Sequence, residues 1–391
     1  MFDCGEYCST APRNRQEISG CACALPTTTT TCQPPNVASA LEAGKAQHPA
    51  GEQTILTPRY LYGRGVAAMR PRHLGKMMEA TVTSTATVPL AQGSPIVWAV
   101  RLTAIASSLL ALGVVGGISW IGTERAIHRP HKTFDWQLAD YPQLHPEQVA
   151  VTGHGGTQLA GSFFAGTGRA TIVLSHGYGA HQGEMLPWAD FLVRAGYNVF
   201  TYDMRARGGS GGDAITLGAL EQHDLIAVVD YLAARPDVDP ERIGALGLSL
   251  GGAVTLMAAA RDHRLKVIVD DCGFSDVASA IGTAYQQFIG LPAFPFAPLS
   301  VLIGEFRTGL SLRQSRPMEI VGKIAPRPLL IIHGAEDREV PAVHSQRNYA
   351  AANSPKELWV IPNAAHAQGR EIAGPEYERR VVAFFRQHLG Q

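Results

Sequence analysis

The 391-residue sequence predicts an α/β protein with a mostly parallel, doubly wound sheet. Between residues 147 and 391, short apolar segments alternate with longer segments of helical periodicity, which is the order expected of β-α-β units. The short segments are apolar almost throughout, as strands of a parallel sheet covered on both faces usually are. Lys and Arg total 33 and Asp and Glu also total 33, so we expect no nucleic-acid partner.

The elements of this domain are expected in a regular order. Strands at residues 148–152 and 159–165 flank a His-Gly-Gly turn, so they are expected to pair antiparallel. The later strands are expected at residues 170–175, 197–203, 242–248, 265–271, 328–333 and 357–361. The helices are expected at residues 184–195, 217–235, 250–261, 341–353 and 375–389. Because longer segments separate these later strands, we expect the strands to run parallel.

The N-terminal segment, residues 1–80, shows no sustained strand or helix periodicity, and we expect a disordered tail. The alternative is that the protein starts at Met77 or Met78 and that the preceding residues are mis-annotated. Five of the six cysteines lie in this segment, at Cys4, Cys8, Cys21, Cys23 and Cys32. Their spacing does not match the paired C-x2-C units of zinc sites, so we expect no metal there.

Residues 97–123 are expected to form a transmembrane helix. The 22 residues from Leu102 to Thr123 carry no charge, which is enough to cross a hydrocarbon layer of about 30 Å, and Trp98 and Trp120 lie near the two ends. A buried core helix is the alternative. The flanking basic residues slightly favour a cytoplasmic location for the later domain, and an external location is the alternative, so the side of the membrane is left open. Residues 124–146 are expected to be a linker.

A nucleophile elbow is predicted by the segment GLSLGG at residues 247–252. It follows an expected strand and opens an expected helix, which is the setting in which G-x-S-x-G places its serine on a tight turn. The turn requires small neighbours because its backbone is strained. It exposes the hydroxyl of Ser249 beside the N–H groups of the helix N-terminus, where negative charge is stabilised. Ser249 is therefore the candidate nucleophile.

A serine nucleophile needs a base, and the base needs a carboxylate to orient it. Asp337 follows one late strand and His366 follows the last strand, so both are expected at the carboxyl edge of the sheet beside the elbow. The chain order Ser, Asp, His is that of this architecture. Three other carboxylates compete with Asp337 for the orienting role: Glu336, Asp270 and Asp271.

With these motifs, the domain at residues 147–391 resembles the α/β-hydrolase superfamily, and in particular its bacterial serine hydrolases with a serine-aminopeptidase-like domain. The segments that carry the resemblance are SHGYGAHQGE (175–184), YDMRARGGSGG (202–212), DPERIGALGLSLGG (239–252), PLLIIHGAEDREVP (328–341) and NAAH (363–366). Together they span nearly the whole domain in the expected order. One departure is Asn363, where relatives more often carry glycine before the histidine.

The resemblance implies a role for each residue of the site. Ser249 would be the nucleophile, Asp337 the acid and His366 the base. The backbone N–H groups of Tyr178 and Leu250 would form the oxyanion hole. The resemblance implies no metal and no organic cofactor, and the residues themselves require none.

An insertion at residues 273–327 is expected to form a small helical cap. It contains an apolar stretch with Phe288, Phe294 and Phe296, which are expected to line an acyl pocket, although the cap can also pack on itself. It carries no cluster of acids to bind the amino terminus of a peptide. We therefore expect a membrane-anchored serine hydrolase of small-molecule carboxylic esters or thioesters. The alternatives are a serine peptidase or aminopeptidase of the same fold and a non-catalytic membrane-anchored binding module. The oligomeric state is left open.

Overall fold

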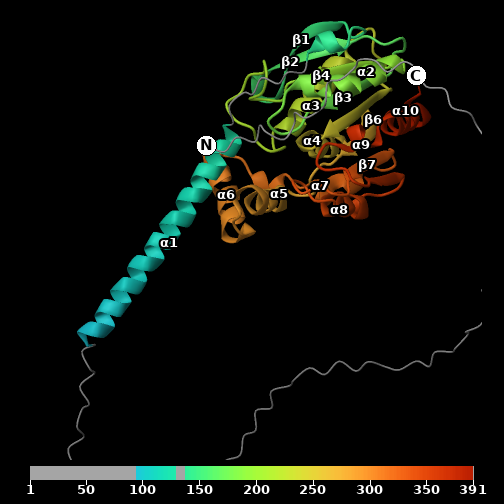
Figure 1. The fold of residues 1–391 in the computed structure, drawn as a ribbon. Helices are drawn as coiled ribbons and strands as arrows, with labels where there is room; N and C mark the ends of the chain where they lie inside the picture. The colour runs from blue at the N-terminus through green and yellow to red at the C-terminus, as the bar shows by residue number, and fades with distance from the viewer. Residues whose placement is uncertain (1–93, 129–136, 391) are drawn as a thin grey trace, which may run out of the picture. The chain divides into compact units, whose positions relative to one another are not determined.

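The computed structural model describes residues 94–128 and 137–390. The expectations for the tail at residues 1–80, including the absence of a metal site at its cysteines, concern residues outside this part of the chain. The described residues contain an apolar N-terminal helix and an α/β domain in which helices pack on both faces of a sheet (Figure 1).

The eight strands found among the described residues form one mixed sheet in the order β1-β2-β4-β3-β5-β6-β7-β8. They are β1 (Pro146–Thr152), β2 (Gln158–Phe164), β3 (Thr171–Ser175), β4 (Asn198–Tyr202), β5 (Ile243–Leu248), β6 (Leu265–Asp271), β7 (Leu329–Gly334) and β8 (Lys356–Ile361). β1 pairs antiparallel with β2, as expected, and β2 pairs antiparallel with β4. The remaining neighbours are parallel, so their carboxyl ends meet at one edge of the sheet.

The helices are α1 (Pro95–Ile127), α2 (Leu186–Arg194), α3 (Glu221–Ala233), α4 (Leu250–Ala259), α5 (Val277–Ala284), α6 (Ala293–Thr308), α7 (Pro317–Ile320), α8 (Val343–Ala351), α9 (Gly369–Ala373) and α10 (Pro375–Leu389). One buried cluster joins the sheet to α3 and α4, and a second joins it to α2 and α10. The strands explain this division, because successive residues point to opposite faces: Val173 lies in the first cluster and Leu174 in the second. The doubly wound α/β-hydrolase fold is therefore confirmed.

α1 is longer than the expected span. Ser94 caps its N-terminus, where its hydroxyl accepts the N–H of Val97, and the helix continues to Ile127. Residues 124–127 were expected in the linker, and this boundary was wrong because the end of α1 packs on the domain. Ile127 is buried and its carbonyl accepts the N–H of Ile215 at 2.9 Å. Most of α1 is exposed, so it is not the core helix considered as the alternative.

The expected cap, residues 273–327, contains α5, α6 and α7. α5 and α6 pack on each other, and α6 also packs along α1 (Figure 1). A small cluster built on Tyr285, Phe296 and Ala297 joins the two cap helices, with Val115 and Ile118 of α1 packed against it. The cap therefore lies between the α/β domain and the apolar helix.

Candidate active site

Ser249 lies on a strained turn between β5 and α4. Its φ is 55°, which is rare for a residue with a side chain, and its N–H donates to the carbonyl of Asp271 at 2.8 Å. The residues two before and two after Ser249 must be glycine, because a side chain at either position would clash with the backbone. A Cβ on Gly247 would lie 2.1 Å from the carbonyl oxygen of Gly251, and a Cβ on Gly251 would lie 2.1 Å from that of Ser175. The sequence thus builds the elbow that the motif predicts.

The candidate triad residues meet at the carboxyl edge of the sheet. Nε2 of His366 is 2.8 Å from Oγ of Ser249, and Nδ1 of His366 is 2.7 Å from Oδ2 of Asp337. The Asp337 carboxylate accepts only, so Nδ1 carries a proton and the neutral ring accepts the Ser249 hydroxyl at Nε2. The three side chains expected to act together are therefore in hydrogen-bond contact.

The contact between Asp337 and His366 shifts the pKa values of both residues. Burial opposes ionisation of Asp337, but hydrogen bonds from His333 and His366 outweigh it and lower the pKa of Asp337 to about 2. Burial lowers the pKa of His366, but the hydrogen bond from its ring to Asp337 and the charge of that carboxylate raise it above its ordinary value overall. Asp337 is thus a fixed anion that favours the imidazolium form of His366.

The competing carboxylates are engaged elsewhere. Glu336 is exposed. Asp270 accepts the N–H of Gly273 at 3.0 Å, and burial raises its pKa to about 7. Asp271 accepts the hydroxyl of Tyr377 at 2.6 Å, and burial raises its pKa to about 6. Neither of these buried acids has a hydrogen bond to His366 among the contacts of the described residues, so the geometry favours Asp337.

His333 is a second partner of Asp337, which sequence reasoning did not assign to the site. Its Nε2 is 2.7 Å from the carbonyl oxygen of Val340 and 3.2 Å from Oδ2 of Asp337. Both are acceptors, so Nε2 carries a proton, while Nδ1 contacts the hydroxyl of Ser345. The feature of the sequence that could have indicated this role is the position of His333 at the end of β7, four residues before Asp337.

The segment after β3 runs beside Ser249. A Cβ on Gly177 would lie 3.5 Å from Cβ of Ser249, so the backbone of the His176-Gly177-Tyr178 turn approaches the nucleophile closely. His176 holds this turn: Nε2 accepts the N–H of Met204 at 2.9 Å, and Nδ1 donates to the carbonyl of Gly177 at 2.8 Å. Burial lowers the pKa of His176 to about 4, so the ring stays neutral.

The two groups expected to form the oxyanion hole belong to segments on either side of Ser249. Leu250 follows it directly as the first residue of α4. Tyr178 follows Gly177, and its hydroxyl donates to the carbonyl of Ala126 in α1 at 2.9 Å. The role of these two N–H groups in catalysis remains a proposal.

Glu184 is a further acid beside the site that sequence reasoning treated only as the start of a helix. One carboxylate oxygen accepts the N–H of Gly177 at 2.6 Å. A Cβ on Gly177 would meet that oxygen at 3.2 Å, so Glu184 and Ser249 lie against the same glycine. Burial raises the pKa of Glu184 to about 7, and the hydrogen bond from Gly177 and the charge of His366 oppose this rise only in part.

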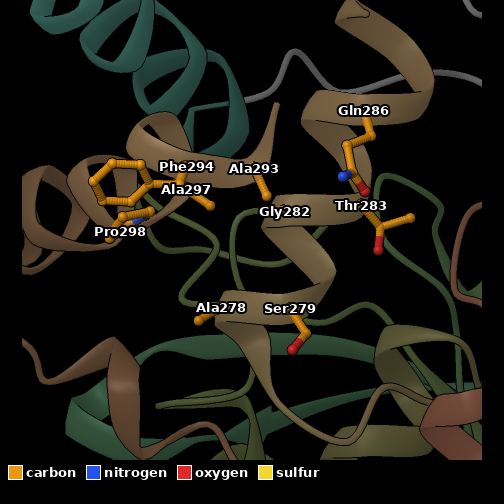
Figure 2. Close-up of a pocket in the computed structure, with 9 residues that line it drawn as sticks. All are labelled: Ala278, Ser279, Gly282, Thr283, Gln286, Ala293, Phe294, Ala297 and Pro298. Carbon is orange, nitrogen blue, oxygen red and sulfur yellow. The ribbon is translucent and has the colours of Figure 1, made fainter. Parts of the chain in front are cut away.

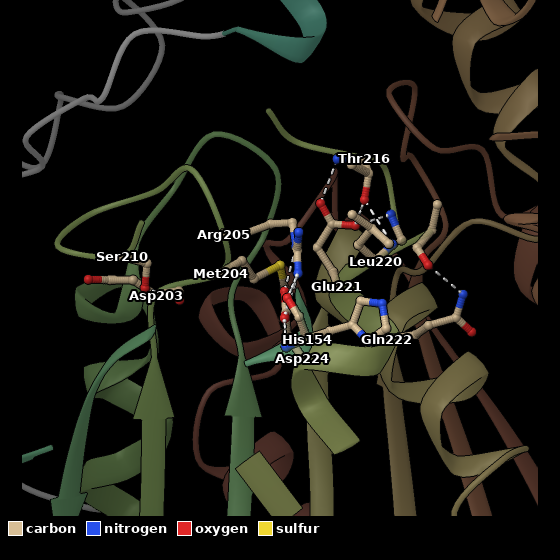
Figure 3. A network of polar contacts seen from close by, with 12 residues as sticks. His154, Asp203, Met204, Arg205, Ser210, Thr216, Leu220, Glu221, Gln222 and Asp224 are labelled. Carbon is tan, nitrogen blue, oxygen red and sulfur yellow. Dashed lines mark hydrogen bonds and ion pairs between the residues drawn. The ribbon is translucent and has the colours of Figure 1, made fainter. Parts of the chain in front are cut away.

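A polar network holds the loop after β4 (Figure 3). Arg205 pairs with Asp224 of α3, through contacts of 2.6 and 2.7 Å. Asp203 accepts the N–H of Gln182 at 2.7 Å, which joins this loop to the segment that carries Glu184. The network therefore positions the rim of the site.

A pocket of about 420 Å³ lies between α5 and α6 (Figure 2). Of the three phenylalanines expected to line an acyl pocket, only Phe294 lines it. Phe296 is buried inside the cap, with its ring centroid 5.4 Å from that of Tyr285, and is not among the residues that line this pocket. Phe288 is half exposed and is not among the residues that line this pocket.

The sheet order, the elbow and the Ser-His-Asp contacts define an α/β hydrolase of the serine type. Residues 187–391 match the prolyl oligopeptidase family, and the chain belongs to this family. The uncharacterized protein YfhR of Escherichia coli (strain K12) is 29% identical over 248 residues, which cover 61% of this chain and 80% of that protein.

Two solved structures show the same fold. The Pyrococcus furiosus esterase Pf2001 is 26% identical, with a TM-score of 0.58, and the similarity covers 68% of this chain and 99% of that one. A puromycin-hydrolyzing peptidase of Mycobacterium tuberculosis is 20% identical, with a TM-score of 0.50 and coverage of 63% and 40%. The shared fold therefore extends to both esterases and peptidases.

Proposed function

We propose that this hydrolase cleaves carboxylic esters or thioesters through an acyl-enzyme on Ser249. The observation that carries the proposal is the position of His366, within 2.8 Å of the Ser249 hydroxyl and 2.7 Å of the Asp337 carboxylate. This is the arrangement in which an imidazole activates a serine and a carboxylate fixes the tautomer of the imidazole.

The proposed reaction has two steps. Oγ of Ser249 attacks the carbonyl carbon while Nε2 of His366 takes its proton, and the resulting oxyanion is bound by the N–H groups of Leu250 and Tyr178. The tetrahedral intermediate collapses, the alcohol or thiol leaves with the proton from His366, and the acyl group stays on Ser249. Water, deprotonated by His366, then attacks the acyl-enzyme and releases the acid.

We assign the acyl chain of the substrate to the cap pocket, and its uncharged lining favours an ester over a peptide. The residues that line it are Ala278, Ser279, Gly282, Thr283, Gln286, Ala293, Phe294, Ala297 and Pro298, none of which is charged. A peptide amino terminus needs an ionised acid. Glu184 is the acid beside Ser249, but it accepts the N–H of Gly177, and its raised pKa makes it a poor partner for an ammonium group. The similarity to the P. furiosus esterase agrees with this proposal.

A second candidate, a serine peptidase, is favoured by the family to which the chain belongs. Nitrophenyl esters of increasing chain length, assayed beside aminoacyl amides, separate the two candidates. Faster hydrolysis of the esters supports the first, and faster hydrolysis of the amides supports the second. Labelling by a fluorophosphonate probe that disappears in Ser249→Ala excludes the non-catalytic binding module, whereas failure of the folded protein to label supports it.

We also propose that α1 anchors the protein in a membrane as a single-pass helix, through residues 97–123, with 147–391 as the catalytic domain and 273–327 as its cap. The apolar window of α1 has a mean hydropathy of 1.9 and is only 6% buried. An exposed apolar surface of this length is unfavourable in water and favourable in a bilayer. Retention of the protein in the membrane fraction after carbonate washing is the expected result, and release into the supernatant contradicts the proposal.

A further inference from the structure

The cap helix α6 packs beside α1 and runs in the same direction. The hydroxyl of Thr123 donates to the carbonyl of Ser300 at 3.3 Å, and Arg307 pairs with Glu124 at 3.0 Å. Toward their N-terminal ends, Pro295 and Leu299 of α6 line a groove with residues 108–115 of α1. The N-terminal end of α6 thus lies beside the middle of the apolar span.

Where α1 and α6 lie side by side, charged residues occur only toward their C-terminal ends. Residues 102–123 of α1 and residues 277–304 of the cap contain no Asp, Glu, Lys or Arg. The Glu124–Arg307 ion pair follows both segments, and the Arg307 guanidinium lies 5.2 Å from the ring centroid of Trp120. Arginine and tryptophan together are typical of the boundary between headgroups and hydrocarbon. The charge-free part of the cap lies on the hydrocarbon side of that boundary.

The side chains that the cap exposes on that side are mostly apolar, with Gln286 and Gln287 as polar exceptions. Phe294 is 78% exposed, and Phe288, Ile289 and Leu302 are each more than half exposed. A cap that faced only water would expose this apolar area at an unfavourable free energy. Phe294 also lines the pocket between α5 and α6, so one edge of the pocket belongs to the exposed apolar surface (Figure 2).

A groove of about 700 Å³ separates the two helices, and its lining is almost entirely apolar. The lining residues are Ser108, Ala111, Leu112, Val115, Pro295, Pro298, Leu299 and Leu302. The one hydroxyl among them is satisfied within the helix, since Ser108 donates to the carbonyl of Ala104 at 2.8 Å. The groove therefore offers few partners for water and suits the hydrocarbon of lipid acyl chains.

We propose that the cap is a second membrane-contacting element: residues 285–302 enter the same leaflet as the C-terminal half of α1, and acyl chains of that leaflet fill the groove between α1 and α6. The ion pair at Glu124 then marks the depth of insertion. The inference rests on the proposed anchor and deepens the proposed function, because an ester with a lipid chain reaches the cap pocket past Phe294 directly from the leaflet.

Photo-crosslinking of the full-length protein tests the insertion. Benzoylphenylalanine is placed singly at Phe294 in the cap, at Leu109 in α1 and at Ile372 in α9, all of which are exposed. Each protein is reconstituted in phosphatidylcholine vesicles, irradiated and analysed by mass spectrometry for lipid adducts. We expect adducts at positions 294 and 109 in comparable yield and at least tenfold less at position 372, which serves as the exposed control.

The other outcomes each overturn the inference. Adducts at position 109 without adducts at 294 leave the anchor intact and place the cap outside the hydrocarbon. Equal yields at 294 and 372 make the cap contact non-specific. Absence of adducts at both 109 and 294 overturns the anchor as well, whereas hydrolysis of soluble esters by the same preparations reports on the catalytic proposal separately.

Discussion

His333 and His366 approach the same oxygen, Oδ2 of Asp337, at 3.2 and 2.7 Å. The carboxylate is thereby held between two imidazoles, and its other oxygen accepts the N–H groups of Glu339 and Val340, both at 2.9 Å. Four contacts to one buried carboxylate leave it little freedom to rotate. The orientation of His366, and with it the reactivity of Ser249, depends on this arrangement.

His333 is accordingly expected to act as a positioning residue. Replacement of His333 by Leu removes this donor and its hydrogen bond to a charged group, worth about 1.5–3 kcal/mol, so we expect kcat to fall roughly tenfold or more with KM nearly unchanged. With one donor fewer, the Asp337 carboxylate attracts the proton of His366 more strongly and raises the pKa of His366. The acid limb of the pH profile therefore moves to higher pH. Ser345→Ala, which perturbs His333 only through Nδ1, is the milder control. An unchanged pH profile and kcat in His333→Leu contradict the assignment.

The pH dependence of the reaction follows from the pKa of His366. The base must be neutral, so kcat/KM is lost as the pH falls through this pKa, and because Asp337 raises the pKa, the loss begins above the value for a free histidine. Asp337→Asn removes the negative charge that raises the pKa of His366. The acid limb of the kcat/KM profile therefore moves to lower pH, and the maximal activity falls by about 10⁴-fold. Profiles of both proteins with one soluble ester measure this. A limb that stays in place in the variant removes Asp337 from its proposed role.

Glu184 gives the protein a stability that changes with pH. Its pKa in the folded protein is about 7 against an ordinary value of 4.5, so the native state holds an extra proton between these values. Stability from this group is therefore highest below pH 4.5 and falls as the pH rises through 7. Glu184→Gln avoids this loss, and its stability relative to wild type should rise by about 2–3 kcal/mol between pH 5 and pH 8, measured as a change in the difference between the two Tm values. A Tm difference that is the same at both pH values contradicts this account.

Gly251 of the nucleophile elbow is a position where adding a single methyl group should lower the stability of the protein strongly. In Gly251→Ala the new Cβ would lie 2.1 Å from the carbonyl oxygen of Ser175, so we expect a loss of about 3 kcal/mol or more of unfolding free energy, or failure to fold. Gly211→Ala is the matched control, because its nearest atom would be an ordinary 3.6 Å away. Urea unfolding of both variants compares them. Equal stability of the two would show that the elbow is less tightly packed than described.

The sequence predicted those parts of the site that depend on local pattern. Ser249 was found because a strand, a tight turn and a helix follow one another, and His366 because it follows the last strand. The contacts of His333 and Glu184 are set by tertiary packing, which brings β7 beside the acid and the 182–185 turn beside Gly177, and no local pattern encodes them. An apolar segment does not reveal which side of a helix faces a pocket, so the sequence could not show that Phe294 lines the pocket between α5 and α6 while Phe296 is buried in the cap.

Peptide mapping of the phosphonyl adduct that a fluorophosphonate forms on the nucleophile, with loss of fluoride, tests the central claim most directly. The full-length protein is treated with a fluorophosphonate, digested and sequenced by mass spectrometry, alongside Ser249→Ala and His366→Ala. We predict one adduct, on the peptide that contains Ser249, absent from the first variant and formed at least a hundredfold more slowly in the second. An adduct on another residue, or equal labelling of Ser249 without His366, contradicts the proposed mechanism.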